Sequence, residues 1–169
     1  MASERPLRRD YAWSCDMPTR WMDNDVYGHV NNVTYYSYFD TVANHFLITE
    51  GGLDIHHSPV IALVVESQCT YRAPVAYPDR LRAGLRVDKL GNRSVTYGVA
   101  IFTDTDTEAV AHGQFVHVFV DRQSRRAVPI PEPPAKRTAR RSRRRSAPVE
   151  VESPPRTYPK GIRDPFAVR

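Results

Sequence analysis

Residues 19–40 read TRWMDNDVYGHVNNVTYYSYFD, in which a polar loop runs directly into an aromatic segment. The loop holds two carboxylates, Asp23 and Asp25, followed by a glycine, a histidine and two asparagines. Apolar residues then recur at the spacing of a helix that buries one face. They are Tyr35, Tyr38, Phe39, Val42, Ala43, Phe46 and Leu47. We therefore expect one long helix at about residues 32–49, with the polar loop at its N-terminus.

Both ends of this helix carry the residues that helix ends favour. Asn31 or Asn32 suits the N-cap, because a short amide side chain accepts hydrogen bonds from the first-turn N–H groups. The glycine pair at 51–52 supplies a C-terminal stop. Unpaired backbone donors and the positive end of the helix dipole gather at the start of a helix. The polar loop therefore lies where a negative charge that develops during a reaction would be stabilised.

Alternating apolar and polar residues predict strands on both sides of the helix. The expected strands cover residues 11–19, 60–72, 80–89, 94–103 and 108–121. The apolar run at 60–65 is typical of a strand covered on both faces. A valine-rich face of the last strand would place His112 in the core. The sum is an α+β domain, with one helix against a curled antiparallel sheet of about five strands. One helix cannot cover both faces of such a sheet, so we expect a homodimer or homotetramer.

The formal net charge of +5 belongs to the C-terminal end of the chain. Residues 132–169 hold 11 Lys and Arg against 4 Asp and Glu, which leaves 13 basic and 15 acidic residues in 1–131. The end of the chain is also rich in Pro and Ser and poor in apolar residues, so we expect a folded domain at 1–131 and a disordered tail at 132–169. A solvated basic tail explains the run at 137–145 better than a nucleic-acid contact, because no aromatic residues interleave with the arginines.

Cysteine usage and hydropathy indicate the compartment. Cys15 and Cys69 form no CxxC pattern, which favours reduced, packed thiols over a disulfide between them. No signal-peptide-like run opens the sequence, and no apolar stretch approaches the length of a membrane span. We therefore expect a cytoplasmic protein.

Three segments together carry a family resemblance. They are DNDVYGHVNNVTY at 23–35, YRAPV at 71–75 and PIPEP at 129–133. Placed between a first strand and a long helix that a four-strand meander follows, this pattern resembles the hotdog-fold acyl-CoA thioesterases of the 4-hydroxybenzoyl-CoA thioesterase type. The likeness covers roughly residues 8–131. It implies a helix wrapped by the sheet, subunits that pair edge to edge and an active site at the dimer interface.

The resemblance also implies roles for the loop. Asp25 corresponds to the catalytic carboxylate, acting as nucleophile or general base. Backbone N–H groups around Asn31 and Asn32 would hold the thioester carbonyl oxygen, and Gly28 and His29 belong to the same substrate-contacting segment. His29 either bonds the substrate or ties the loop to the sheet. No cofactor is implied, because coenzyme A enters as part of the substrate.

The chemistry of these residues supports the same assignment. A thioester carbonyl is electrophilic and its thiolate leaves readily, so the site needs one base or nucleophile and one oxyanion stabiliser. A carboxylate beside a helix N-terminus supplies both. Asp23 is a secondary candidate that more simply braces the loop. Glu66 is either a second polar group of the pocket or a plain edge charge.

Binding of coenzyme A, a candidate metal site and the overall activity can also be considered from the sequence. Arg72, Arg80 and Arg82 are candidates for the phosphates of coenzyme A, because guanidinium groups suit phosphate. A metal site is disfavoured, since the twelfth position counted from Asp23 is Thr34 and not glutamate. The sequence thus predicts hydrolysis of a fatty or small acyl-CoA to free acid and CoA. The alternatives are hydrolysis of an acyl group on a carrier protein and non-catalytic acyl-CoA binding.

Overall fold

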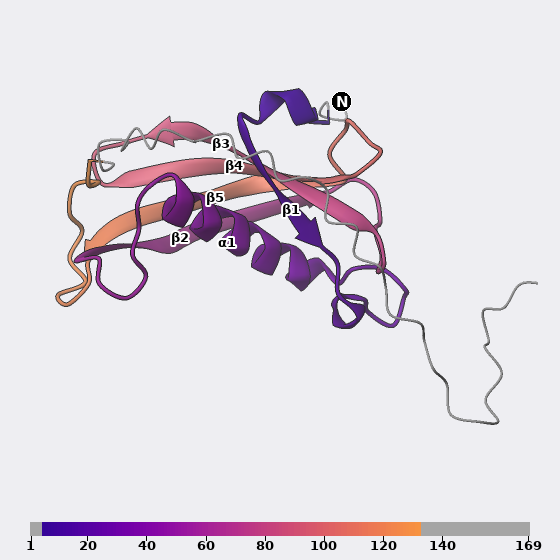
Figure 1. The fold of residues 1–169 in the computed structure, drawn as a ribbon, viewed down its shortest axis with the longest axis horizontal. Coiled ribbons are helices and arrows are strands. Elements are labelled where there is room, and N and C mark those ends of the chain that lie inside the picture. Colours follow the sequence, from indigo (N-terminus) through magenta and orange to yellow (C-terminus); the bar gives the residue numbers. More distant parts are fainter. Residues whose placement is uncertain (1–4, 133–169) are drawn as a thin grey trace, which may run out of the picture. The chain divides into compact units, whose positions relative to one another are not determined.

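A single long helix, α1 (Asn32–Thr49), lies across one face of a five-stranded antiparallel sheet (Figure 1). The computed structural model describes residues 5–132. The strands are β1 (Trp13–Pro18), β2 (Val60–Tyr71), β3 (Arg80–Leu90), β4 (Ser94–Thr103) and β5 (Ala111–Asp121). Short 3-10 turns at Arg8–Asp10 and Trp21–Asp23 flank β1. The predicted hotdog architecture, one helix with a curved sheet of five strands, is confirmed.

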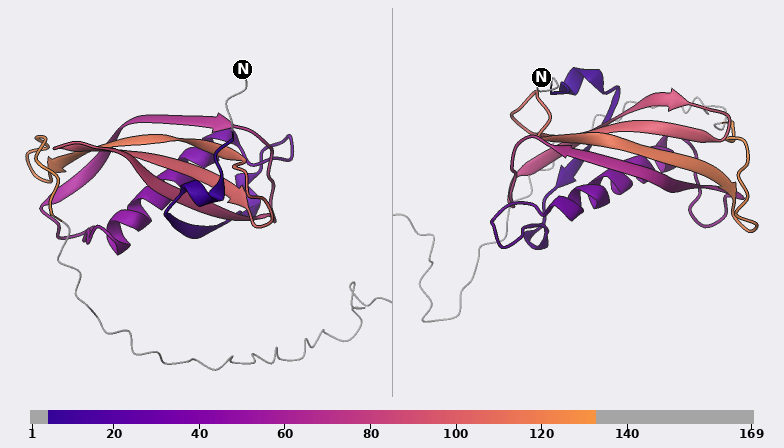
Figure 2. Two further views of the ribbon diagram at one scale, coloured as in Figure 1. Left: turned by 90° about the horizontal axis from the view of Figure 1, so that it is seen from above. Right: turned by 180° about the vertical axis from the view of Figure 1, so that it is seen from behind.

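The order of the strands in the sheet is β1-β3-β4-β5-β2. Strand β1 therefore forms one edge, where Trp13 pairs with Leu85 of β3. Strand β2 forms the other edge and pairs along its length with β5. The sheet curves around α1, as the view from above shows (Figure 2). The helix runs along the sheet, so its start lies at one end of the sheet and its C-terminal end at the other (Figure 1).

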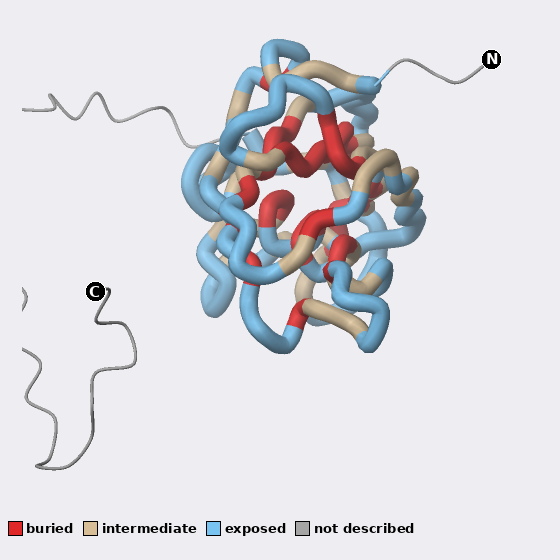
Figure 3. Tube along the Cα trace, turned by 90° about the vertical axis from the view of Figure 1, so that its right-hand side faces the viewer, coloured by how far each residue is buried: buried red, intermediate tan, exposed pale blue. Residues whose placement is uncertain are grey.

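The core lies between α1 and the concave face of the sheet (Figure 3). Phe39 and Val42 of the helix are fully buried, and Phe39 meets Phe115 of β5 edge-on at 5.7 Å between ring centroids. Each such side chain stabilises the fold by about 1.5–3 kcal/mol through burial. The helix predicted from sequence is confirmed in its bounds and in most of its buried face. Phe46 is only partly buried.

The predicted orientation of the last strand is wrong. The face of β5 toward the helix carries Phe115, His117 and Phe119, and His117 is 1% exposed. Burial lowers the pKa of His117, an effect that the negative charge of Asp40 partly offsets. His112 points to the opposite face, where it is only half-buried. The core histidine is therefore His117.

Strand β2 is also placed differently from the prediction, which expected a strand covered on both faces. It has a neighbour on one side only, and its central residues Leu63, Val64 and Val65 are 39%, 42% and 62% exposed. A shift of register between Val64 and Glu66 marks a bulge at Val65. The described chain thus has an open, apolar sheet edge.

Three further predictions from the sequence concern the C-terminal tail, the two cysteines and membrane-spanning segments. The tail predicted at 132–169 lies outside the described residues, apart from Glu132. Both thiols, Cys15 and Cys69, are free. Within residues 5–132, no helix combines the length and apolar character needed to cross a membrane.

Candidate active site

The loop before α1 is built from two consecutive tight turns. Asp25 accepts a hydrogen bond from the backbone N–H of Tyr27 at 2.8 Å through Oδ1, the local bond of an Asx turn. The Gly28 N–H donates to the Asp25 carbonyl at 3.1 Å, and Gly28 has φ +84°, a conformation that side chains disfavour. The Asp25 N–H then donates to the His29 carbonyl at 2.8 Å. These bonds fix the backbone on both sides of the Asp25 carboxylate.

The loop is held against the segment that follows β2. The Val30 N–H donates to the Val75 carbonyl at 2.8 Å, and the Tyr77 N–H donates to Oδ1 of Asn24 at 3.0 Å. The YRAPV segment therefore packs beside the Asp25 loop, although 46 to 50 positions separate them in the sequence.

Only one oxygen of the Asp25 carboxylate is engaged by the turn. The His29 N–H approaches the same Oδ1 at 3.5 Å, which adds a weak second contact. Within residues 5–132 no donor reaches Oδ2 of Asp25. The side chain is half-buried, so this second oxygen remains available to a ligand.

Asp23 has a different environment, although it precedes Asp25 by two residues. It is 3% exposed, and its carboxylate accepts from the Tyr38 hydroxyl at 2.6 Å and from the Arg20 N–H at 2.8 Å. The Arg20 guanidinium lies 3.1 Å away. Burial alone would raise the pKa of Asp23, but the Tyr38 and Arg20 hydrogen bonds outweigh it and lower the pKa. The Tyr38 bond therefore ties the loop to the helix, and the Arg20 bonds hold the turn in which Asp23 lies.

The helix start leaves one backbone donor without an acceptor. Asn31 is the N-cap, and its side chain accepts from the Val33 N–H at 3.2 Å. The Asn31 N–H itself donates to the Asp23 carbonyl, and the Thr34 N–H donates to the Asn31 carbonyl. Among the residues of the described loop and first turn, the Asn32 N–H alone has no such acceptor between Val30 and Thr34. It lies at the positive end of the α1 dipole.

A groove brings the loop and the YRAPV segment together. Its lining includes four of the residues singled out from the sequence, Asp25, His29, Asn32 and Arg72. The remaining lining residues are Val30, Tyr35, Tyr71, Ala73 and Pro74. Gly28 and Asn31 shape the turn and the cap behind the groove without lining it. The residues that carry the unpaired carboxylate oxygen and the unpaired helix-start N–H, Asp25 and Asn32, thus line one groove, an arrangement suited to acyl transfer.

Three candidates from the sequence lie outside this groove. Glu66 is exposed on β2, and its cross-strand partner is Val116, on the face of the sheet that α1 does not cover. Arg82 of β3 pairs with Asp16 of β1 at 2.9 Å, and Arg80 lies two residues earlier on the same strand. Arg72 lies in the groove, and its Nε donates to Nε2 of His112 at 3.2 Å.

Sequence reasoning did not identify Tyr71 as a residue of the site. Its hydroxyl donates to the Asn32 carbonyl at 3.0 Å, and its ring meets Tyr35 edge-on at 5.2 Å. Burial, reinforced by Cys69, raises the pKa of Tyr71, so the hydroxyl keeps its proton at neutral pH. The sequence signal that could have identified Tyr71 is its position at the end of a strand, where it is the first residue of the YRAPV segment. Tyr71 thus braces the helix start from the sheet.

Metal-ligating side chains do not gather in the described part of the chain. No group of three or more His, Cys, Asp or Glu residues there has the arrangement to hold a metal ion. Asp25 and His29 have no third such neighbour.

Comparison with known proteins places this geometry in a family. The model of the thioesterase-like superfamily matches residues 19–137. The crystal structure of the PA5185 protein from Pseudomonas aeruginosa strain PAO1 is 58% identical, with a TM-score of 0.74 over 76% of this chain and 90% of that one. The PA2801 protein of Pseudomonas aeruginosa, described as a candidate thioesterase, is 29% identical, with a TM-score of 0.66 over 70% and 91%.

A third solved structure has a more specific description. It is a candidate acyl-CoA thioesterase from Xanthomonas campestris, 28% identical, with a TM-score of 0.59 over 67% of this chain and 96% of that one. The matched family region includes the Asp25 loop, α1 and all the strands after it. Since that region makes up more than half of the sequence, the chain belongs to the thioesterase-like superfamily.

Proposed function

We propose that this chain hydrolyses acyl-CoA thioesters to the free acid and coenzyme A, with Asp25 as the catalytic carboxylate. One observation carries the proposal. Oδ2 of Asp25 and the N–H of Asn32 are both without a protein partner in the described chain, and both residues line one groove. Hydrolysis of a thioester requires these two functions, a base or nucleophile and an oxyanion donor.

The geometry suggests how the reaction would proceed. The carbonyl oxygen of the thioester accepts from the Asn32 N–H, and the dipole of α1 stabilises the negative charge that develops on it. In a general-base route, Asp25 takes a proton from a water molecule as the water oxygen bonds to the acyl carbon. In a nucleophilic route, a carboxylate oxygen forms that bond and water then opens the anhydride. In both routes the C–S bond breaks and its electron pair leaves on the sulfur of CoA.

The neighbouring residues take supporting roles in this proposal. Tyr27 anchors Oδ1 of Asp25, which directs Oδ2 to the acyl carbon. Tyr71 holds the first residue of α1 through the Asn32 carbonyl. Arg72 is the one groove residue with a permanent positive charge and is suited to the phosphates of CoA. Arg80 and Arg82 do not line the groove, so we assign them no substrate contact.

The open β2 edge supports a homodimer as the working form. Its exposed apolar residues and unpaired backbone groups form a template for a second strand. A two-fold axis would pair β2 with β2 of a second copy and extend the sheet across both subunits. Tyr71, the last residue of β2, lines the groove, which therefore lies at one end of this edge.

A panel of acyl-CoA thioesters, followed by release of free thiol, tests the proposal. We expect turnover of at least one thioester and a fall in kcat of about a hundredfold or more in Asp25→Asn, with KM little changed. Asp104→Asn is the matched control, because the same chemical change falls on an exposed carboxylate of the turn after β4, outside the groove. Thiol release by Asp25→Asn at the rate of the unaltered protein would overturn the assignment.

A further inference from the structure

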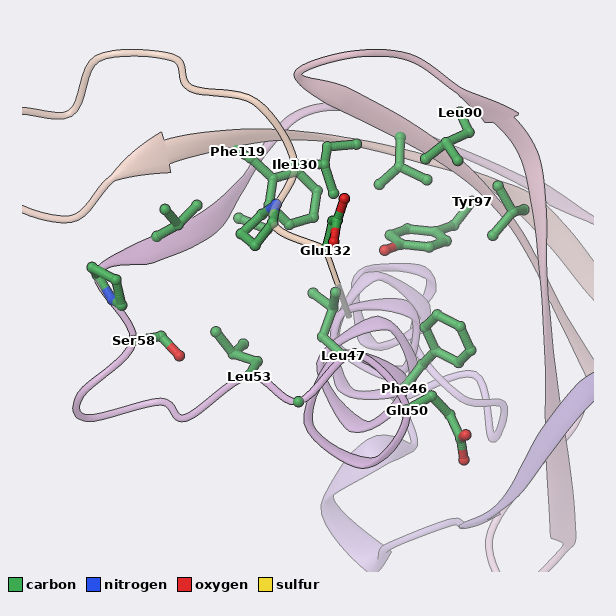
Figure 4. Close-up of a pocket in the computed structure, with 18 residues that line it drawn as sticks. Phe46, Leu47, Glu50, Leu53, Ser58, Leu90, Tyr97, Phe119, Ile130 and Glu132 are labelled. Atoms are coloured by element: carbon green, nitrogen blue, oxygen red, sulfur yellow. The ribbon is translucent and has the colours of Figure 1, made fainter. Parts of the chain in front are cut away.

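A second cavity lies at the C-terminal end of α1, away from the Asp25 groove (Figure 4). Phe46 and Leu47 approach it from the helix, and Phe119 and Ile130 approach it from the opposite side. Ala62 contributes from the first part of β2. Its volume of about 430 Å³ falls within the range of small-molecule sites. It explains why Phe46, alone in the apolar stripe of α1, is only partly buried.

The chemistry of the lining specifies an apolar occupant. The walls are made mainly of aliphatic and aromatic side chains, and the charged residues among the lining, Glu50 and Glu132, are exposed. Figure 4 shows the Glu50 carboxylate turned away from the cavity. Two acidic side chains among the lining disfavour an anionic ligand. An uncharged aliphatic chain fits the apolar walls.

The subunit's own Asp25 is badly placed to serve this cavity. Asp25 precedes α1, whereas the cavity lies at its other end, and 18 helical residues span about 27 Å. The space under the helix between the two sites is filled by the buried side chains of Tyr38, Phe39 and Val42. An acyl chain bound at Asp25 has no open path to the cavity of the same subunit through this core.

Pairing of two β2 edges gives a shorter route. Strands related by a two-fold axis run antiparallel, so pairing about the middle of β2 places Val60 beside Tyr71 of the partner subunit. Val60 lines the cavity, and Tyr71 lines the groove of Asp25. We propose that the cavity receives the aliphatic chain of an acyl group whose thioester lies at Asp25 of the partner subunit. This inference rests on the proposed function and names thioesters of medium to long aliphatic acyl chains as the substrate class.

Filling the cavity tests the ligand assignment. Ala62→Phe places a ring in the cavity, and we expect kcat/KM for decanoyl-CoA to fall at least about tenfold while acetyl-CoA turnover stays within about twofold. Val118→Phe is the control, because Val118 neighbours Phe119 on β5 but points to the other face of the sheet. A second variant, Ile130→Ala, enlarges the same cavity and should shift the preference toward longer chains.

Mixed dimers test the arrangement between subunits. A dimer of one Asp25→Asn chain and one Ala62→Phe chain, purified through two different tags, retains one site with both an intact Asp25 and an open partner cavity. We expect it to recover about half of the decanoyl-CoA activity of the unaltered dimer. If each cavity served its own Asp25, both sites would be defective and the activity would stay at the level of the variants.

The outcomes separate this inference from the proposed function. Absence of thiol release from every acyl-CoA by the unaltered protein would overturn the proposed function. Turnover of acyl-CoA with the same chain-length profile in the unaltered protein, Ala62→Phe and Ile130→Ala would overturn the cavity assignment alone. Loss of decanoyl-CoA activity in Ala62→Phe, with no recovery in the mixed dimer, would overturn the contribution of the partner.

Discussion

Replacing Asn32 by proline removes one backbone N–H from the start of α1 and leaves the helix able to form. Asn32 is the first residue of the helix, where proline is tolerated because that N–H has no acceptor within the helix. Asn31 has φ −59° and ψ 138°, outside the α region that proline disfavours for the residue before it and near polyproline II. The Asn32 carbonyl can still accept from Tyr71. The substitution thus isolates a single donor.

The expected loss follows from the role of that donor. Negative charge develops on the carbonyl oxygen only as the acyl carbon becomes tetrahedral, so the N–H stabilises the transition state more than the bound substrate. Removal of one oxyanion donor lowers kcat by about a hundredfold to a thousandfold, or about 2.7–4 kcal/mol. KM should change little. Asn32→Ala keeps the N–H and loses only an exposed side chain, and we expect its kcat within about threefold of the unaltered protein.

The assay is thiol release from the acyl-CoA that the unaltered protein cleaves fastest. Far-ultraviolet circular dichroism and thermal unfolding establish that α1 is intact in both variants. A folded Asn32→Pro protein with kcat close to that of the unaltered protein would refute the assignment of this N–H. Equal losses in the proline and alanine variants would instead assign the effect to the side chain.

Three further predictions concern the loop and the chain end. Asp23→Asn should lower the free energy of unfolding by about 1–3 kcal/mol at neutral pH, because it weakens the bonds to Arg20 and Tyr38. The pKa of Asp23 is lowered in the folded state, so its stabilisation is present above the ordinary carboxyl pKa of about 4 and is lost as the pH falls through the lower folded value. Urea unfolding at neutral and acid pH measures both effects, and a difference between variant and unaltered protein that does not shrink in acid would contradict them. Gly28→Ala should destabilise the fold by about 1–2 kcal/mol in the same assay through its positive φ alone, since open space surrounds the position; an unchanged urea midpoint would count against it. A chain ending at Glu132 should keep its circular dichroism spectrum and its thiol-release activity, and loss of either would show that later residues contribute.

The helix was predictable because its determinants are local. The apolar spacing, the asparagine cap and the glycine stop all act within one or two turns, and the observed bounds, Asn32–Thr49, coincide with the expected ones. The same holds for the position of Asp25 before the helix start. The architecture around them followed from five alternating segments and one amphipathic helix.

The two faces of β5 were not predictable from alternation alone. Val116 and Val118 point to one face and Phe115 and Phe119 to the other, so both faces are apolar in sequence. The pattern therefore does not decide which face meets α1. The larger rings are buried under the helix, and the histidine between them, His117, is buried with them.

The roles of the two loop aspartates depend on geometry that sequence spacing does not contain. The 3-10 turn at Trp21–Asp23 directs Asp23 toward Tyr38 of the helix, and the bonds that it accepts there leave it no free oxygen. The following turn directs Asp25 to the groove and uses one of its oxygens. Two residues of separation are enough for this difference, because Asp23 ends the 3-10 turn whereas Asp25 opens the Asx turn that follows.

The apolar run of β2 is the error with the most consequence. Continuous hydrophobicity indicated a strand covered on both faces, yet β2 lies at the sheet edge with Leu63, Val64 and Val65 exposed. An apolar run predicts that its residues are buried, but it does not show whether the same chain or a second copy covers them. An apolar edge strand left in water would invite uncontrolled pairing with other chains. Pairing of two β2 edges would cover these apolar residues while β2 stays at the edge of its own sheet. The failed prediction for one chain therefore favours the proposed dimer.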